Sequence, residues 1–180
     1  MNSDAPPTLR LRRLDAAEAA ALAPALAEVL VDCVAGGASV SFMHPLDPAR
    51  ALAFWRGVAE GVAAGDRALF VAEEAGLVLG TVQLLLGMPE NQPHRAEIAK
   101  MLVRRSARGR GTGTALMRAA EALAVDNGRS LLVLDTAEGG EGERLYSRLG
   151  WVAVGTIPRY ALHPDGRPCG STFFYRDLAA

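Results

Sequence analysis

The sequence has little lysine and little cysteine. Lysine occurs once, at Lys100, and arginine supplies the other 18 of the 19 basic residues. Any chemistry that needs a lysine amine therefore has one candidate position. Cysteine occurs twice, at Cys33 and Cys169. Because residues 1–8 are polar and Pro-rich and have no apolar signal core, we expect both thiols to stay reduced in a cytoplasmic protein.

The chain also has no excess of charge and no long apolar run. Its 19 basic and 20 acidic residues nearly cancel, which excludes a nucleic-acid-binding protein whose affinity depends on overall basicity. The most apolar stretch, residues 16–34, is interrupted by Glu18, Pro24, Glu28 and Asp32. It therefore predicts a helix packed on a core and not a membrane span. The three histidines are scattered and lack the spacing of metal ligands, so we expect no metal site.

Strand and helix patterns alternate along the whole chain, and its length fits one domain over residues 1–180. Asp15 and Asp47 are predicted helix N-caps, with Pro48 in a first helical position. Pro24 is expected to kink or divide the first helix. The predicted strands are 9–14, 68–73, 77–86, 96–103, 131–134, 151–157 and 171–176, and the predicted helices are 16–36, 48–64, 111–127 and 141–149. This mixture predicts an α/β (α+β) domain built on one sheet.

Residues 104–113 form a glycine- and arginine-rich turn between a predicted strand and a predicted helix. The first amides of a helix lack partners and carry the positive end of its dipole, and glycine lets an anion approach the backbone closely, so this turn predicts a phosphate or pyrophosphate site. A nucleotide P-loop is excluded because it needs Lys and then Ser or Thr after its last Gly. A dinucleotide site is disfavoured because Thr114 stands where the third small residue belongs. Four arginines within seven residues add positive charge: Arg104, Arg105, Arg108 and Arg110.

The pattern Arg108-x-x-Gly111-x-Gly113, after a strand and opening a helix, resembles the acyl-coenzyme A loop of the GCN5-related N-acetyltransferase (GNAT) family. Residues 131–135 look like the family strand that parts from its neighbour to admit the thioester. Residues 143–151 look like the late helix with its tyrosine and Gly-aromatic ending. The resemblance covers about residues 68–176 and is closest to small-molecule acetyltransferases like the tabtoxin resistance protein. It implies a mixed, largely antiparallel central sheet with flanking helices, whose strands are splayed at the acyl-CoA site.

The resemblance also implies which residues hold acetyl-CoA. In the family the strand before the loop pairs its backbone with the pantetheine arm, and the loop amides hold the pyrophosphate. Carried onto this sequence, the strand residues are Met101, Leu102 and Val103, and the loop residues are Arg108, Gly109, Arg110, Gly111, Thr112, Gly113 and Thr114.

Three side chains are candidates for the chemistry. Tyr146 matches the family tyrosine that protonates the leaving thiolate; the alternative is a helix tyrosine packed on the core with its hydroxyl satisfied. Glu97 begins the strand that feeds the loop, where the family often places a base, and strand alternation puts it on one face with Ala99, Met101 and Val103. The alternative for Glu97 is a strand-end carboxylate that pairs with Arg95 or solvent.

Asp135 ends a buried strand, where ligands gather in open sheets. It is a candidate to bind the substrate amine or to act as a second base, and the alternative is a cap of the loop toward Thr136. Cys33 and Cys169 have no neighbouring His, so we interpret both as structural.

The function that the resemblance implies is acetyl-CoA-dependent N-acetylation of a small-molecule amine, by direct attack in a ternary complex. It needs neither a metal nor a cysteine nucleophile, and it implies that a homodimer can form. We expect no nucleic acid and no membrane as partner. The alternatives are transfer of another acyl group, acetylation of a protein N-terminus or lysine, and a non-catalytic acyl-CoA sensor. The sequence does not identify the acceptor.

Overall fold

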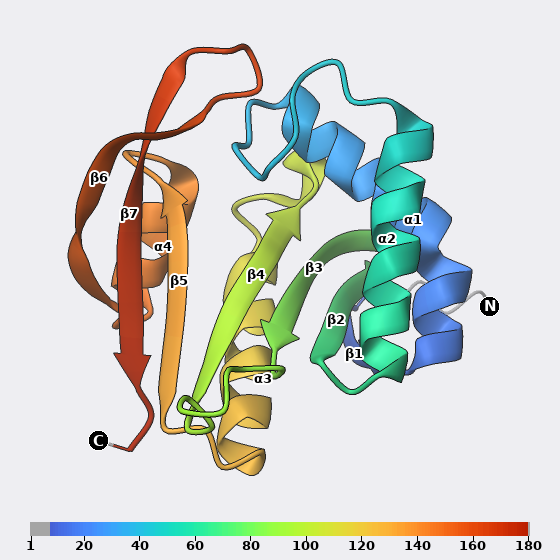
Figure 1. Cartoon of the computed structure of the whole chain (residues 1–180). Helices are drawn as coiled ribbons and strands as arrows, with labels where there is room; N and C mark the ends of the chain where they lie inside the picture. Colours follow the sequence, from blue (N-terminus) through green and yellow to red (C-terminus); the bar gives the residue numbers. More distant parts are fainter. Residues whose placement is uncertain (1–7, 180) are drawn as a thin grey trace.

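One mixed sheet forms the middle of the molecule. The computed structural model describes residues 8–179, so the predicted polar start of the chain lies almost entirely outside the described residues. The strands of this part lie in the order β1-β2-β3-β4-β5-β7-β6 (Figure 1). All neighbours run antiparallel except β4 and β5, which are parallel. The elements are β1 (Arg10–Leu14), α1 (Ala16–Ala35), α2 (Pro48–Ala63), β2 (Arg67–Glu74), β3 (Leu77–Leu85), β4 (Arg95–Val103), a 3-10 turn (Arg105–Ala107), α3 (Thr112–Asp126), β5 (Leu131–Ala137), α4 (Glu141–Arg148), β6 (Val152–Leu162) and β7 (Pro168–Asp177). The predicted mixed, largely antiparallel sheet with flanking helices is confirmed.

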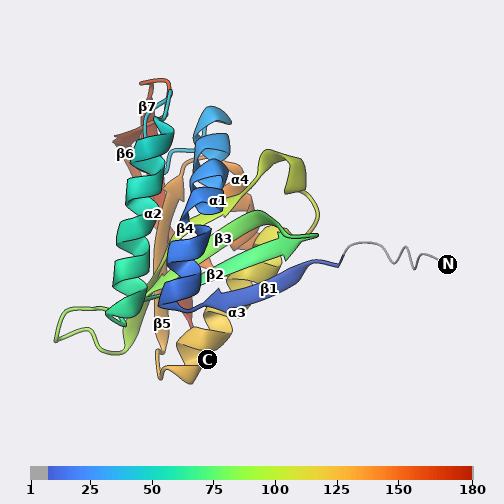
Figure 2. The same cartoon turned by 90° about the vertical axis from the view of Figure 1, so that its right-hand side faces the viewer.

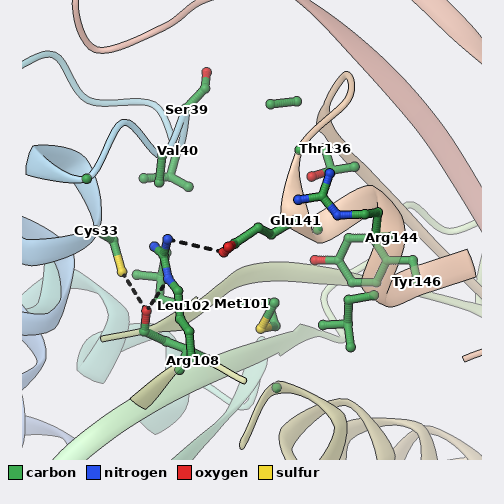
Figure 3. Close-up of a pocket in the computed structure, with 18 of the residues that line it drawn as sticks. Cys33, Ser39, Val40, Met101, Leu102, Arg108, Thr136, Glu141, Arg144 and Tyr146 are labelled. Carbon is green, nitrogen blue, oxygen red and sulfur yellow. Dashed lines mark hydrogen bonds and ion pairs between the residues drawn. The ribbon is translucent and has the colours of Figure 1, made fainter. Parts of the chain in front are cut away.

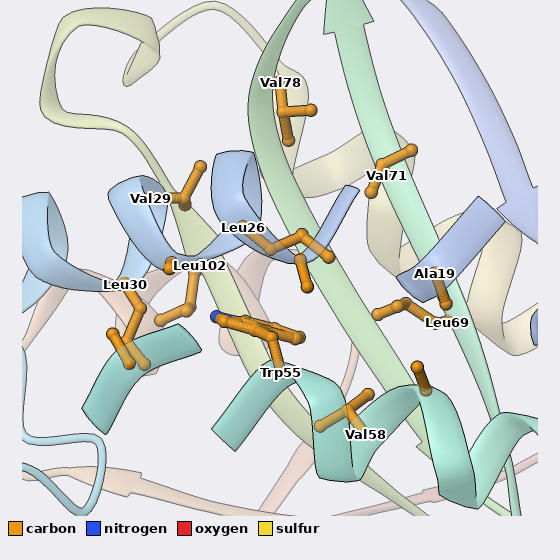
Figure 4. Close-up of a cluster of buried hydrophobic side chains, with 14 of the residues drawn as sticks. Ala19, Leu26, Val29, Leu30, Trp55, Val58, Leu69, Val71, Val78 and Leu102 are labelled. Atoms are coloured by element: carbon orange, nitrogen blue, oxygen red, sulfur yellow. The ribbon is translucent and has the colours of Figure 1, made fainter. Parts of the chain in front are cut away.

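Helices cover both faces of the sheet. α1 and α2 pack together on one face, and α3 and α4 lie on the other (Figure 2). The core of the α1/α2 face includes Trp55, which is fully buried, together with Leu26, Leu30 and Leu69 (Figure 4). The core of the α3/α4 face joins α3 and α4 to side chains from β2, β3, β4, β5 and β7. Apolar packing therefore covers one face of the sheet as far as β7 and the α1/α2 face over β1 to β4.

The first two helices begin as the sequence predicts. The Asp15 carboxylate accepts a hydrogen bond from the Glu18 amide at 2.8 Å, and the Glu18 carboxylate accepts one from the Asp15 amide at 3.0 Å. This reciprocal pair satisfies two amides of a helix start. Asp47 caps the Ala49 amide of α2 at 2.8 Å. Pro24 lies inside α1, which continues as one helix to Ala35.

β4 and β5 stay paired over a short distance only. Their parallel register runs from Arg95 with Leu131 to Glu97 with Val133. β4 nevertheless continues to residue 103 and β5 to residue 137. The two strands diverge toward their C-terminal ends, as predicted for the acyl-CoA site (Figure 1). Each strand beyond the last pair therefore has an edge that its neighbour does not occupy.

A bulge in β4 changes which side chains share a face. Lys100 and Met101 of β4 lie opposite the single residue Val82 of β3, and Lys100 has a left-handed φ of 47°. An inserted residue reverses the alternation beyond it. Before the bulge, Ile98 belongs to the core of the α3/α4 face, so Glu97 points to the α1/α2 face; beyond it, Met101 packs on the α3/α4 core. The prediction of one common face was therefore wrong for the set Glu97, Ala99, Met101 and Val103.

The last strands are longer than their apolar stretches predict. β5 pairs with β7 along its whole length, from Leu131 with Asp177 to Ala137 with Ser171. β6 pairs with β7 as far as Leu162. Main-chain hydrogen bonds therefore extend these strands into polar segments that side-chain patterns do not reveal.

Candidate active site

A pocket of about 800 Å³ lies where β4 and β5 part (Figure 3). Its walls are the α1–α2 loop, the end of β4, the glycine loop with the start of α3, and the β5–α4 turn with α4. Ten of the residues that the sequence singles out line it: Met101, Leu102, Val103, Arg108, Gly109, Gly111, Thr112, Gly113, Thr114 and Tyr146. Three others do not line it, namely Arg110, Glu97 and Asp135.

The glycine loop turns its backbone into this pocket. Gly109 and Gly111 have φ values of 74° and 82°, in the left-handed region that favours glycine. Gly111 is the N-cap of α3 and supplies no side-chain cap. The first amides of α3 therefore face the pocket, where they suit an anionic group. A side chain at Gly113 would meet the Leu145 methyl at 3.1 Å, so the loop also lies close against α4.

Tyr146 is a buried titratable group in the pocket wall. It is 5% exposed and packs its ring near Trp151 and Phe174, with centroids 6.0 and 5.9 Å away. Burial raises the pKa of Tyr146 well above its ordinary value, and the negative charge of Asp135 raises it further. Its hydroxyl hydrogen-bonds to no other residue in the described part of the chain, and Figure 3 shows it directed into the pocket. The hydroxyl is thus protonated, and it can donate its hydrogen bond to a group that binds in the pocket.

Asp135 and Lys100 lie on the other face of the gap. The Asp135 carboxylate is exposed and accepts a hydrogen bond from the Ser171 hydroxyl at 2.6 Å. The Lys100 ammonium donates to the Ser41 hydroxyl at 3.2 Å and lies 5.7 Å from the centre of the Phe54 ring. Burial lowers the pKa of Lys100, and the charge of Asp135 partly offsets this. Both side chains therefore stand on the α1/α2 face beside the start of the gap.

Glu97 lies at the vertex of the gap, in the last residue pair that joins β4 to β5. Its carboxylate pairs with the Arg95 guanidinium at 3.3 Å, and its side chain is 39% exposed. This is the ion pair that the sequence offers as the alternative to a base. Asp135 stands two residues beyond Val133, the partner of Glu97, so it is the carboxylate nearer to the open part of the gap.

The sequence matches the model of the acetyltransferase (GNAT) family over residues 24–151. That range covers most of the chain and contains β4, the glycine loop and α4. The chain belongs to the GNAT family. It is therefore an acyltransferase by family, and the predicted family assignment is confirmed.

Solved structures with the same fold come from several bacteria. An N-acetyltransferase from Staphylococcus aureus Mu50 is 21% identical, with a TM-score of 0.78 over 95% of this chain and 99% of its own. A putative acetyltransferase from Salmonella typhimurium, determined with its cofactor acetyl-CoA, is 22% identical, with a TM-score of 0.75 over 96% of each chain. A ribosomal-protein-alanine N-acetyltransferase from Brucella melitensis is 22% identical, with a TM-score of 0.79 over 94% of this chain and 99% of its own. These likenesses establish the fold of this GNAT protein.

In the GNAT protein, carboxylates from other elements neutralise the positive charge that the sequence concentrates at the loop. Arg104 pairs with Glu28, Arg105 with Asp32 and Arg110 with Glu74, at 2.8, 2.9 and 2.5 Å. Of the loop arginines, Arg108 lines the pocket. Its guanidinium donates to the Val103 carbonyl and pairs with Glu141 across the pocket at 3.1 Å (Figure 3). Three of the four loop charges therefore fasten the loop to distant elements.

Several pocket residues of the GNAT protein carry no strong signal in the sequence. The α1–α2 loop contributes Ser39 and Val40, and the β6–β7 turn contributes His163. The acidic, glycine-rich segment 138–142 also lines the pocket. The glycines are the sequence feature that indicates its close packing, because a Cβ atom at Gly140 or Gly142 would crowd the Ala137 carbonyl or the Thr136 side chain. Cys33 lines the pocket too, where burial raises the pKa of its thiol.

Two further findings concern metals and membranes. Within residues 8–179, no three His, Cys, Asp or Glu side chains are grouped so that they could bind a metal ion. In the same residues, no helix has both the length and the apolar character needed to cross a bilayer.

Replacing Gly111 with alanine should weaken acetyl-CoA binding. A left-handed φ is strained for alanine by about 1–2 kcal/mol, so the loop will relax and turn its amides away; we expect the Kd to rise about tenfold. Calorimetric titration of the variant with acetyl-CoA measures this. Gly57→Ala is the matched control, because Gly57 lies exposed within α2 with open space around it. An unchanged Kd for Gly111→Ala would remove the loop from the binding site.

Proposed function

We propose that this GNAT protein transfers an acetyl group from acetyl-CoA to the amine of a small molecule, by direct attack within a ternary complex. The observation that carries the proposal is the gap between β4 and β5, which is bordered by different chemistry on its two faces. Tyr146 and the glycine loop border it on the α3/α4 face. Asp135 borders it on the α1/α2 face. A donor and an acceptor can therefore approach the same opening from opposite sides.

The α3/α4 side suits the acetyl-CoA donor. The amides at the start of α3, with Arg108 beside them, would hold the pyrophosphate. The edge of β4 from Met101 to Val103 faces the gap without a partner strand, so its backbone would pair with the pantetheine arm. The bulge adds an unpaired main-chain group near Met101, suited to polarise the thioester carbonyl. The acetyl-CoA complex of the Salmonella neighbour supports this donor.

Transfer forms a nitrogen–carbon bond and breaks the carbon–sulfur bond of the thioester. The amine loses one proton and the departing thiol gains one. Asp135 stands where it would receive the first proton, directly or through water, and the Tyr146 hydroxyl would donate to the sulfur. Glu97, at the vertex and paired with Arg95, would act as a base only after that ion pair opens.

A thiol-release assay with acetyl-CoA and a panel of small amines tests the proposal. We expect release of coenzyme A that depends on the amine, with a mass increase of one acetyl group on that amine. A panel of peptides with free N-termini and lysines is run in parallel. Turnover on the peptides and not on the small amines would favour a protein acetyltransferase. Binding of acetyl-CoA without turnover on either panel would favour an acyl-CoA sensor.

The small-molecule class, and the closer likeness to enzymes of the tabtoxin resistance type, belong to the proposal. Supporting them, the pocket is bordered by the α1–α2 loop and the β6–β7 turn. The Ser39 hydroxyl donates to the Leu162 carbonyl at 2.8 Å, and the His44 amide donates to the Pro164 carbonyl at 3.0 Å. This bridge crosses the free end of the gap and leaves less room for a protein chain than for a small molecule.

A further inference from the structure

The lone lysine of the chain stands at the mouth of the gap. Lys100 occupies the bulge of β4, directly before the pocket-lining Met101. Its side chain extends over the α1/α2 face, where Ser41 and Phe54 contact the ammonium. Within the described residues, no carboxylate lies within ion-pair distance of it. The loop arginines near the pocket, in contrast, each pair with a glutamate or an aspartate.

A partly buried ammonium with these contacts is incompletely satisfied. Burial removes part of its hydration, and a single hydroxyl and an aromatic face replace only some of it. An ammonium has three donors, and one of them has a partner at 3.2 Å. An anionic group that binds beside Lys100 would supply the missing partner through a charge-assisted hydrogen bond.

Asp135 completes a pair of opposite charges on this face. It stands on β5 across the start of the gap and interacts electrostatically with Lys100. The two groups are nevertheless too far apart for the ion-pair distance of 4.0 Å. Ser171 holds the carboxylate in place from β7. The face therefore offers one site for a positive group and one for a negative group, on two strands that do not touch there.

We propose that the acceptor is an amine that also carries a carboxylate, as amino acids do, with Lys100 binding the carboxylate and Asp135 the reacting amine. This inference rests on the proposed N-acetyltransferase function and specifies its acceptor. Lys100 is then a specificity-determining residue. Its contacts with Ser41 and Phe54 fix its position before the acceptor arrives.

The test compares amines that differ by a carboxylate alone. Thiol release is measured for three pairs: alanine and ethylamine, phenylalanine and phenethylamine, lysine and cadaverine. For at least one pair, we expect the wild-type enzyme to favour the carboxylated member in kcat/KM by about tenfold or more. Lys100→Met keeps the apolar stem and removes the charge, so it should reduce that preference at least about tenfold. Lys100→Arg keeps the charge and should retain more of the preference than Lys100→Met.

The outcomes separate this inference from the function on which it rests. Acetylation of the amines with no preference for a carboxylate, or a preference that Lys100→Met leaves unchanged, would overturn the inference and leave the acetyltransferase standing. Release of coenzyme A from none of the amines, despite acetyl-CoA binding, would overturn the function itself. Thermal melting and acetyl-CoA titration check that each variant is folded. If Lys100→Met does not fold, the wild-type pairs and Lys100→Arg still decide.

Discussion

Tyr146→Phe should lower kcat about 10²-fold and leave the Kd for acetyl-CoA within about twofold. The substitution keeps the ring that packs against Trp151 and Phe174 and removes only the hydroxyl. The leaving sulfur then gains charge without a donor in a buried wall of the pocket, where charge is poorly solvated. Steady-state thiol release gives kcat, and calorimetric titration gives the Kd.

A control and a pH profile make this result specific to the hydroxyl. Tyr175→Phe removes a tyrosine hydroxyl from the exposed surface of β7, away from the pocket lining, and should leave kcat unchanged. Because the pKa of Tyr146 is raised, its hydroxyl stays protonated above the ordinary titration range of tyrosine. We therefore expect kcat of the wild type not to fall between about pH 8 and pH 10 through loss of this proton. Unchanged turnover in Tyr146→Phe would leave this tyrosine as a packing residue.

Trp55→Ala should lower the free energy of unfolding by about 3–5 kcal/mol. Trp55 is 0% exposed and packs edge-on to Phe54, at a centroid distance of 5.1 Å, within the core of the α1/α2 face. Removing the indole leaves a cavity between α1, α2 and the sheet that rigid elements cannot fill. Urea unfolding of the two proteins measures the difference.

Trp55→Phe is the matched control for this substitution. Phenylalanine fills most of the space, and it also removes the Trp55 Nε1–H group, which is buried without a hydrogen-bond partner in the described residues. The loss should therefore be clearly smaller than that of Trp55→Ala. A loss below about 1 kcal/mol in Trp55→Ala would show that the helices collapse onto the space left behind.

Much of the fold can be predicted from local sequence because its signals are local. Asp15 with Glu18, and Asp47 with Pro48, mark helix starts through contacts within one turn. The glycine loop is likewise visible, since its backbone angles demand glycine at positions 109 and 111. These features depend on neighbours in the chain and not on packing.

The remaining features depend on partners far away in the sequence. Nothing near Lys100 marks it as a bulge, because the extra residue is defined by its register with β3. In the sequence, the arginine-rich loop has the pattern of an anion-binding site. In the fold, Glu28, Asp32 and Glu74 from other elements neutralise three of its arginines. Lys100 and Asp135 are separated by 35 positions, and they face one another across the gap only because β4 and β5 pair up to Glu97 and Val133 and then diverge.

Because β4 and β5 pair over only a short distance, the sheet consists of two parts, one formed by β1 to β4 and the other by β5 to β7. Three residue pairs form the hinge at one end. At the other end, Ser39 and His44 of the α1–α2 loop hydrogen-bond to Leu162 at the end of β6 and to Pro164 in the β6–β7 turn, and these two bonds connect the two parts again. On the α3/α4 face one apolar core contacts both parts of the sheet, whereas the core on the α1/α2 face contacts only β1 to β4 among the described residues. Breaking the hydrogen bonds of Ser39 and His44 would therefore let the two parts of the sheet separate on the α1/α2 face, while the core on the α3/α4 face keeps the acetyl-CoA side in place.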